Sequence, residues 1–302
     1  MKNLKFLVSL TNNENDYQLE QAEAAQQAAG KTGVDVSIIY AQNDAINQST
    51  QLLKAVQSPK ELRPDAIIFE PVGGTALPQV ARAAAKEGIG WVILNREADY
   101  LQELRRTASA PMFSVSSNHV EIGRIEGRQM AALLRGGGSA LYIQGPSENS
   151  AAKERTAGTH ETKPANIQLT MLKGQWTVES AQKSVRSWLK LTTSQRAAID
   201  LVAAQNDAMA MGARDAFEEI ANEDERERWL NLPFLGCDGL PKTGQAWVKS
   251  GLLAATIFVP PNAGQAIEML TEAIESPKMP SEKVMTEAVS IPRLELLGIK
   301  KQ

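Results

Sequence analysis

Short, continuous apolar runs alternate along the chain with longer segments in which apolar residues recur at helical spacing. Eight such runs predict buried strands, which begin near residues 6, 34, 66 and 91 in the first half and near 140, 167, 199 and 234 in the second. Runs of four to six apolar residues separated by helices are typical of parallel strands that are covered on both faces. The pattern therefore predicts an α/β fold with doubly wound parallel sheets.

The two halves of the chain repeat one another. The second set of strands follows the first at offsets of 134, 133, 133 and 143 residues, and a nearly constant offset indicates a duplicated unit. A length of 302 residues also favours two domains over one. We therefore expect two Rossmann-like lobes.

Glycines and charges predict where several helices lie. A helix over Gln18–Ala29 is expected to close at Gly30, and a helix over Leu77–Lys86 is expected to end at Gly88. The charged run Glu223–Arg228 predicts a solvated helix face.

Polar side chains follow most of the predicted strands. In open α/β sheets the ligand crevice lies at the carboxyl ends of the strands. These ends carry amides, carboxylates and guanidinium groups, which suit a ligand with many hydroxyl groups. The segments concerned are Thr11–Tyr17, Glu70–Gly74, Asn95–Glu97, Gln144–Asn149, Gln205–Asp207 and Asp238–Gly239.

Composition excludes several other classes of function. A net charge of −3 offers no basic excess for nucleic acid, and no apolar run is long enough to span a membrane. One cysteine, Cys237, and two histidines, His119 and His160, predict neither an internal disulfide nor a metal site, and a Ser-His-Asp triad is poorly supported. Gly73-Gly74-Thr75 lacks the spacing of a nucleotide-binding loop and predicts a tight turn into a helix. No cofactor is expected.

The first eight residues contain no cleavage site typical of an export signal. Two locations are therefore expected under different conditions. The protein is periplasmic if a signal peptide was removed, and cytoplasmic if Met1 is the native start.

Five motifs occur in an order that matches a known family. They are Leu10–Asn13, Leu94–Arg96, Ser150–Arg155, Gln205–Ala213 and Leu235–Gly239. Over essentially the whole chain, this order closely resembles the periplasmic sugar-binding proteins of ABC transporters, of the ribose-binding, type I class. The resemblance implies two lobes joined by a hinge of three crossovers, with the ligand held between them.

The resemblance also implies candidate binding residues in both lobes. In the first lobe it places Glu70 where the ribose binders carry an amide, which indicates extra donors on the ligand, such as an amine. Two departures leave the particular sugar open: the crossover amide of the ribose binders is Val259 here, and the paired Phe residues of the first loop are polar. The full set implied for the ligand site is Asn13, Asn15, Asp16, Tyr17, Glu70, Asn95, Arg96, Arg155, Trp176, Asn206 and Asp238.

Elementary chemistry assigns these residues roles. Arg96 and Arg155 present planar forks that donate paired hydrogen bonds to neighbouring hydroxyls or a carboxylate. Trp176 offers an apolar face to the C–H side of a sugar ring, while Asp238 and Glu70 act as acceptors that orient hydroxyl groups.

The expected function is capture of a sugar or sugar-like solute by hinge closure and its delivery to an ABC permease, if the protein is exported. We expect a monomer. The expected lobes are 1–116 with 260–286 and 117–259 with 287–302. A cytosolic ligand sensor of the same fold is the alternative, and a carbohydrate-processing enzyme is disfavoured because no nucleophile lies beside a base.

Overall fold

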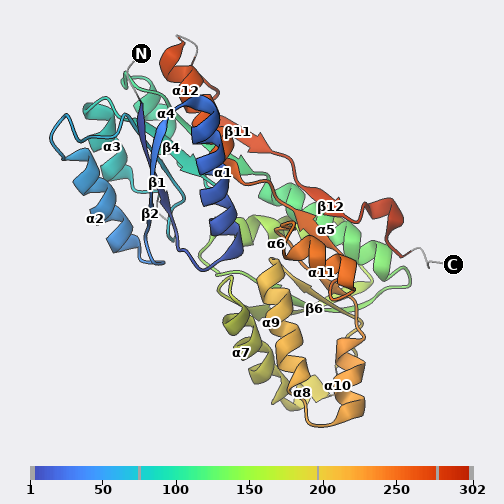
Figure 1. The fold of residues 1–302 in the computed structure, drawn as a ribbon. Helices are drawn as coiled ribbons and strands as arrows, with labels where there is room; N and C mark the ends of the chain where they lie inside the picture. The colour runs from blue at the N-terminus through green and yellow to red at the C-terminus, as the bar shows by residue number, and fades with distance from the viewer. Residues whose placement is uncertain (1–3, 74–75, 196, 277–278, 299–302) are drawn as a thin grey trace. The chain divides into compact units, whose positions relative to one another are not determined.

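The computed structural model describes residues 4–73, 76–195, 197–276 and 279–298. The chain divides into two compact units, which we call the first and the second unit (Figure 1). The first unit comprises Met1–Ser117 and Pro261–Thr286, and the second comprises Asn118–Pro260 and Glu287–Gln302. The chain therefore crosses between the units three times, and two of these crossovers lie one residue beyond the predicted lobe limits.

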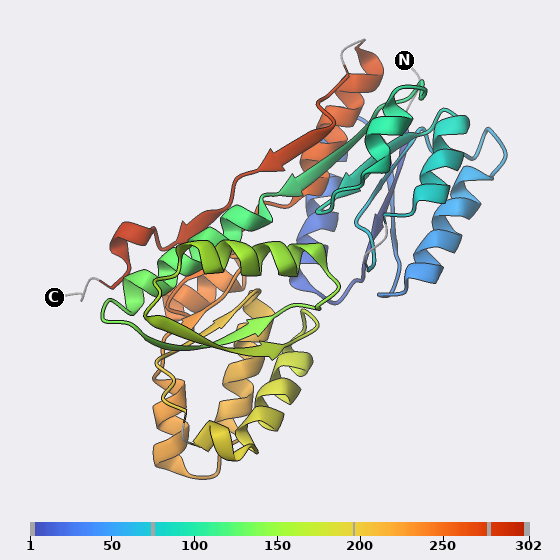
Figure 2. The same cartoon turned by 180° about the vertical axis from the view of Figure 1, so that it is seen from behind.

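A parallel sheet of six strands forms the first unit. Its spatial order is β11-β5-β4-β3-β1-β2, and β11 pairs with β5 along one edge (Figure 2). The strands are β1 Lys5–Leu10, β2 Asp35–Tyr40, β3 Ala66–Phe69, β4 Gly90–Leu94, β5 Met112–Ser117 and β11 Lys283–Thr286.

Helices cover both faces of this sheet and explain the continuous apolar runs. In β3, Ala66 and Ile68 pack into one core with the first and last helices of the unit, whereas Ile67 and Phe69 pack into a second core on the opposite face. Since both faces are buried, each residue of such a strand must be apolar. The helices are α1 Asp16–Thr32, α2 Ala45–Val56, α3 Pro78–Lys86, α4 Tyr100–Arg105 and α12 Asn262–Glu275.

The second unit contains a parallel sheet of four strands in the order β7-β6-β8-β9 and an antiparallel pair, β10 with β12. Single parallel bridges at Leu235–Ala255 and Asp238–Phe258 join β9 and the loop after it to the segment around β10. The strands are β6 Gly138–Gln144, β7 Ile167–Lys173, β8 Leu201–Ala204, β9 Phe234–Leu235, β10 Thr256–Phe258 and β12 Val289–Ile291.

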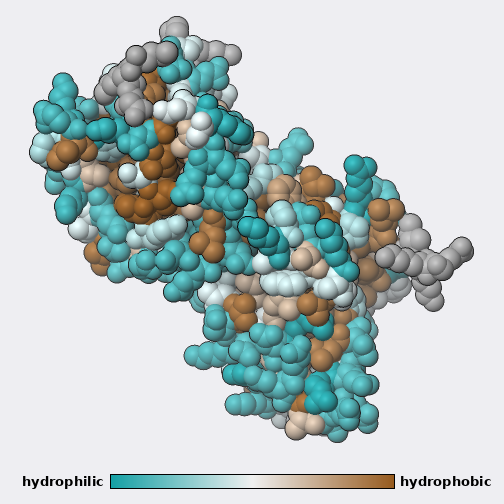
Figure 3. Space-filling view, in the orientation of Figure 1, coloured by the Kyte–Doolittle hydropathy of each residue, from teal (hydrophilic) through white to brown (hydrophobic). Residues whose placement is uncertain are grey.

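Two apolar cores again lie on opposite faces of the second sheet. Helix α10 presents its charged run to solvent while Trp229 is buried beneath it, and the surface over α7 and α10 is mostly hydrophilic (Figure 3). The solvated helix face expected there is confirmed. The helices are α5 His119–Leu133, α6 Ser150–Thr162, α7 Val178–Leu189, α8 Thr192–Gln195, α9 Asp207–Glu218, α10 Glu223–Leu230, α11 Gly244–Ser250 and the short 3₁₀ helix η1 Leu294–Leu296.

The repeat inferred from strand spacing is visible in the strand order. The first unit orders its early strands β2-β1-β3-β4, and the second unit orders its own as β7-β6-β8-β9. In each unit the strand that comes first in the sequence, β1 or β6, lies second in this spatial order. The α/β class with doubly wound parallel sheets is confirmed.

The structure corrects one local expectation and agrees with another. Helix α1 runs through Gly30 and ends instead at Gly33, which adopts the left-handed conformation (φ 72°) and donates to the Ala29 carbonyl at 2.9 Å. Gly73 also has a positive φ of 77°, as a tight turn requires, whereas Gly74 and Thr75 lie outside the described residues.

Strand β5 had no counterpart among the predicted runs because half of its residues are serines. All six residues are nevertheless buried. Their hydroxyls find polar partners: Ser114 Oγ donates to the Glu282 carbonyl at 3.4 Å, and Ser117 Oγ lies 3.2 Å from Thr286 Oγ1. A buried strand whose serines are hydrogen-bonded does not form an apolar run, so hydrophobic patterning fails to predict it.

Candidate functional site

A cluster of buried polar side chains lies at the carboxyl ends of β3 and β4 in the first unit. Glu70 Oε2 accepts hydrogen bonds from Gln18 Nε2 at 2.9 Å and from Asn95 Nδ2 at 3.2 Å. Asn95 Oδ1 in turn accepts from Asn262 Nδ2. We call Gln18, Glu70, Asn95 and Asn262 the Glu70 cluster. All four side chains are buried, and Glu70 is only 6% exposed.

The main chain around Glu70 is held in place independently of its carboxylate. Gln48, on α2, is fully buried and donates from Nε2 to the Glu70 carbonyl at 2.8 Å. Its Oε1 accepts from the main-chain N–H of Val72 at 2.9 Å, and the Glu70 N–H donates to the Ser9 carbonyl at 3.0 Å. The position of Glu70 is therefore fixed before any ligand arrives.

The loop before α1 and the first turn of that helix hold four of the predicted ligand-site residues, and these residues have different environments. Asn15 caps the helix, because its Oδ1 accepts from the N–H groups of Tyr17 and Gln18. Tyr17 is buried and its hydroxyl accepts from Asn95 Nδ2 at 3.5 Å, which joins it to the Glu70 cluster. Asn13 and Asp16 are exposed.

Asn262 connects the cluster to the crossovers between the units. It begins α12, directly after Pro260-Pro261, and its Oδ1 accepts from Thr286 Oγ1 at 3.1 Å. Thr286 and Ser117, which touch at 3.2 Å, are the last first-unit residues before the other two crossovers. Val259, at the position where the resemblance implied an amide, is a core residue that is 1% exposed.

Arg96 is attached to the same edge of the sheet through the main chain. Its guanidinium donates to the Asn95 carbonyl at 2.6 Å, and Asn95 has the left-handed backbone conformation with φ 56°. The turn after β4 thus directs Asn95 into the Glu70 cluster and leaves Arg96 half-buried.

The second unit carries a corresponding group at the carboxyl ends of β6 and β8. Arg155, on α6, is 6% exposed, and its guanidinium donates to the Gln205 carbonyl. Its Cζ lies 5.5 Å from the centroid of the Trp176 ring, within cation–π range. Asn206 Nδ2 donates to the Trp176 carbonyl at 3.0 Å, while its Oδ1 caps α9. We call Arg155, Trp176, Gln205 and Asn206 the Arg155 cluster.

Gly145 allows the Trp176 ring to lie close to the end of β6. A Cβ atom at Gly145 would come within 2.2 Å of the ring carbon Cζ2, so any larger residue would displace the indole. Trp176 itself has a left-handed backbone (φ 67°) and is half-buried against the second-unit core. The ring therefore has a set position.

Behind the Arg155 cluster lies a buried carboxylate. Gln205 Nε2 donates to the Tyr142 hydroxyl at 2.9 Å, and that hydroxyl donates to Glu126 Oε2 at 2.7 Å. Burial raises the pKa of Glu126 to about 7, although its hydrogen bond from Tyr142 and the charge of Arg155 act in the opposite direction. Burial also raises the pKa of Tyr142 well above its ordinary value.

Asp238 follows β9 and lies beside a second buried carboxyl group. Asp207 accepts from the Gly239 N–H at 2.8 Å and from Thr256 Oγ1 at 2.6 Å. Burial and the neighbouring charge of Asp238 raise the pKa of Asp207 well above its ordinary range. Asp238 is half-buried with φ 102°, and the thiol of Cys237 beside it is fully buried, which raises its pKa as well.

The structure thus brings most of the predicted residues together within their own units. Tyr17, Glu70 and Asn95 share one hydrogen-bonded network, and Arg155, Trp176 and Asn206 share another. Asn13 and Asp16 stand apart from both by their exposure. Sequence reasoning missed Gln18, Gln48, Gln205 and Asn262 as members of these networks, although Gln205 was inside a noted motif and Asn262 follows a conspicuous proline pair.

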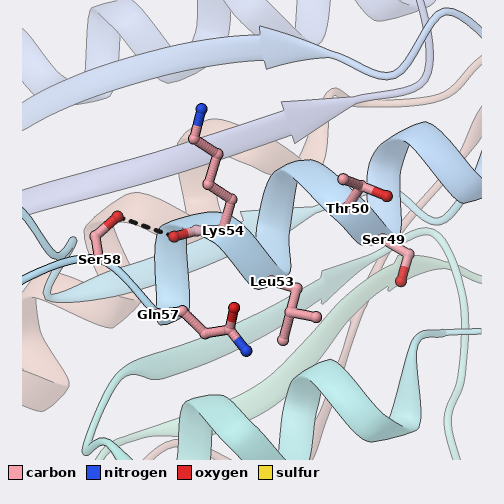
Figure 4. A pocket seen from close by; sticks show the side chains of 6 residues that line it. All are labelled: Ser49, Thr50, Leu53, Lys54, Gln57 and Ser58. Atoms are coloured by element: carbon pink, nitrogen blue, oxygen red, sulfur yellow. Dashed lines mark hydrogen bonds between the residues drawn. The ribbon is translucent and has the colours of Figure 1, made fainter.

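A shallow hollow of about 400 Å³ lies elsewhere, on α2 (Figure 4). Its lining comes from that helix and the two residues after it, namely Ser49, Thr50, Leu53, Lys54, Gln57 and Ser58.

Within the described ranges, no group of three His, Cys, Asp or Glu side chains is arranged to hold a metal ion. None of the described helices combines the length and apolar character needed to cross a membrane.

The sequence profile of the periplasmic binding protein domain matches residues 6–278. The chain belongs to this family. A putative rhizopine-binding protein of Rhizobium meliloti is 32% identical over 194 residues, which are 62% of this chain and 58% of that relative. The ribose import binding protein RbsB of Escherichia coli strain K12 is 25% identical over 278 residues, which are 91% of this chain and 86% of the relative.

Solved structures of periplasmic binding proteins share the fold. A galactofuranose-binding protein superposes with a TM-score of 0.80 at 22% identity, covering 98% of this chain and 95% of its own. A solute-binding protein from Actinobacillus succinogenes 130z with bound D-allose gives 0.81 at 20% identity, covering 97% and 98%. The family member described here therefore has the type I periplasmic binding protein fold, as the resemblance implied.

Proposed function

We propose that this periplasmic binding protein captures a sugar or sugar-like polyol reversibly and delivers it to an ABC-type permease. One observation carries the proposal: each unit places a cluster of buried, preorganised polar groups at the carboxyl edge of its own parallel sheet. The relatives named for rhizopine and ribose binding, and the structural neighbours named for galactofuranose and D-allose, support the same class of ligand.

The two clusters offer complementary chemistry for such a ligand. The Glu70 cluster supplies a carboxylate and amides, which accept and donate hydrogen bonds to hydroxyl groups. The Arg155 cluster supplies a guanidinium fork and an indole, whose apolar surface suits the C–H face of a sugar ring. One unit alone provides only half of these contacts.

A ligand that contacts both clusters favours a closed state, because only closure allows both units to bind the same molecule. A micromolar dissociation constant needs about 8 kcal/mol of binding free energy. Several charge-assisted hydrogen bonds and one stacking surface can supply this amount after the entropy losses of association.

In this role the ligand leaves chemically unchanged. The Glu70 cluster holds one carboxylate and the Arg155 cluster one guanidinium in fixed hydrogen bonds, and the described members of the two clusters include no nucleophile activated by an adjacent base. We further propose that the protein acts as a monomer in the periplasm, a location that the family name supports. Cell fractionation and analytical ultracentrifugation test these two points.

A thermal-shift screen of pentoses, hexoses, polyols and sugar acids, followed by calorimetric titration of each hit, tests the proposal. At least one carbohydrate-like compound is expected to raise the melting temperature and to bind with one-to-one stoichiometry. Incubation of the hit with the protein should return it unaltered by mass spectrometry. Absence of any hit in the panel, or conversion of the compound, would contradict the proposal.

A further inference from the structure

Among the described residues, the buried carboxylate of Glu70 has no positively charged partner. In the described part of the chain it accepts hydrogen bonds only from the neutral amides of Gln18 and Asn95, and it forms no ion pair with a lysine, arginine or histidine. The residue is 6% exposed. Burying a charge is costly unless the charge is paired, because the interior replaces the solvation by water only in part.

Both protein hydrogen bonds reach the same oxygen of this carboxylate. Gln18 and Asn95 donate to Oε2, while Oε1 receives no hydrogen bond from the residues that the structure describes. The unoccupied oxygen retains its acceptor capacity, since an ionised carboxylate takes several donors. The cluster is thus complete on one side of the carboxylate and open on the other.

The amide donors alone do not require a charge at this position. A glutamine side chain has a carbonyl oxygen that would accept from Gln18 and Asn95 equally well, and it would avoid the cost of burying an anion. A neutral acceptor would also suffice to orient a ligand hydroxyl. A negative charge at this position contributes most to binding when the ligand brings a positive one, because attraction between the two charges then adds to the hydrogen bond.

We infer that Glu70 is the counter-ion for a cationic group of the ligand, and that the preferred ligand is an amino sugar or amino polyol. This inference rests on the proposed function and specifies its ligand class. The ammonium group donates to Oε1 of Glu70, where a charge-assisted hydrogen bond is about twice as strong as a neutral one. The remaining hydroxyls of the ligand bind the neighbouring amides and the Arg155 cluster.

Calorimetric titration with matched pairs of ligands at pH 7 tests the inference. Each pair consists of a neutral compound and its amino derivative: D-glucose with D-glucosamine, D-galactose with D-galactosamine, and myo-inositol with an amino-inositol. In the pair that binds, the amino compound is expected to bind at least about tenfold more tightly than its neutral partner, as expected for one charge-assisted contact.

The variant Glu70→Gln separates charge from shape. It keeps an acceptor for Gln18 and Asn95, so its melting temperature without ligand is expected to stay close to that of the wild type, and its tenfold preference for the amino compound is expected to disappear. Glu61→Gln is the matched control, because it removes one negative charge from an exposed position between α2 and β3, before the amino end of that strand. This control is expected to keep the preference.

Two results would overturn the inference. If the neutral compound binds as tightly as its amino partner, or if Glu70→Gln retains the preference, Glu70 is not a counter-ion and the proposed sugar-binding function still stands. If neither member of any pair binds, and the wider screen of neutral sugars also fails, both the inference and the proposed function are wrong.

Discussion

Arg155 combines two contacts in one buried side chain. It is held by the Gln205 carbonyl, lies over the Trp176 ring and projects from α6 toward the ends of β6 and β8. Removal of a buried guanidinium that binds a ligand leaves polar groups of that ligand without hydrogen-bond partners. The free-energy cost of these unpaired groups exceeds what the hydrogen bonds themselves contribute.

Replacing Arg155 with alanine is therefore expected to weaken binding of the hit by at least about 2 kcal/mol. We expect a similar loss for Asp238→Ala, the acceptor beside Asp207 in the same unit. Calorimetric titration measures both, with Arg128→Ala as the control, because Arg128 lies on α5 in an exposed ion pair with Glu121. Unchanged affinity in both site variants would remove these residues from the ligand site.

Glu126 makes the stability of the second unit depend on pH. Its pKa is about 7 in the folded protein against an ordinary value of 4.5, so the folded state holds a proton that the unfolded state has already released between these values. Raising the pH through this window is therefore expected to lower the free energy of unfolding, by up to about 3 kcal/mol. The raised pKa of Asp207 acts in the same direction.

The variant Glu126→Gln is expected to lose most of this dependence and to be more stable than the wild type at pH 8, because it no longer buries a charge. Denaturant unfolding at pH 5, 6, 7 and 8 provides the measurement. Glu179→Gln, an exposed change on α7, should follow the wild-type curve. A wild-type free energy of unfolding that rises between pH 5 and pH 8 would contradict the assignment.

At the scale of elements, α5 and α6 pack backbone against backbone. A Cβ atom at Gly123 would lie 1.9 Å from the Arg155 carbonyl oxygen, and one at Gly158 would lie 2.0 Å from the Val120 carbonyl oxygen. The two glycines therefore set the distance between the helices. Since Arg155 is on α6, they also set the position of its guanidinium.

Gly158→Ala is expected to push the helices apart, to destabilise the second unit by about 2 kcal/mol or more, and to weaken ligand binding through the displaced Arg155. Gly136→Ala is the control, because no atom lies within 4 Å of the added Cβ and the change should stay within about 0.5 kcal/mol. Denaturant unfolding and titration report the two effects. Equal stability of the two variants would show that the contact between α5 and α6 tolerates an added methyl group.

These elements also explain which parts of the structure the sequence could predict. Strands such as β3 and β4 are buried on both faces, so their apolar runs are unambiguous, whereas the serines of β5 hide a buried strand. Residues that directly follow a strand, such as Glu70 and Asn95, can be assigned to the carboxyl edge of the sheet. Gln48 and Asn262 reach the same cluster from helices. Such a contact depends on how the helix packs against the sheet, so no local sequence pattern predicts it.

The whole molecule consists of two units joined by three crossovers. Hydrogen bonds within the first unit link the Glu70 cluster to residues at all three crossovers. Asn262, Thr286 and Ser117 form a hydrogen-bonded series from the Glu70 cluster to the residues that border the crossovers. Pro260 and Pro261 restrict the backbone at one crossover, so they position the hinge more than they supply its freedom.

Closure on the ligand is expected to reduce the radius of gyration of the protein in solution. Small-angle X-ray scattering with and without a saturating amount of the hit measures this change. The control is a stereoisomer that does not bind in the thermal-shift screen. Identical scattering with and without the bound ligand would argue against hinge closure.

Cys237 is the single cysteine of the chain, and its thiol is fully buried with a raised pKa. Because the thiolate is the reactive species, this side chain should resist alkylating reagents in the folded state. A cysteine introduced at exposed Asn13 would then be the one site that a maleimide fluorophore labels. A dye at this exposed position in the loop before α1 would turn the native scaffold into an optical sensor of its own ligand, without any prior removal of thiols.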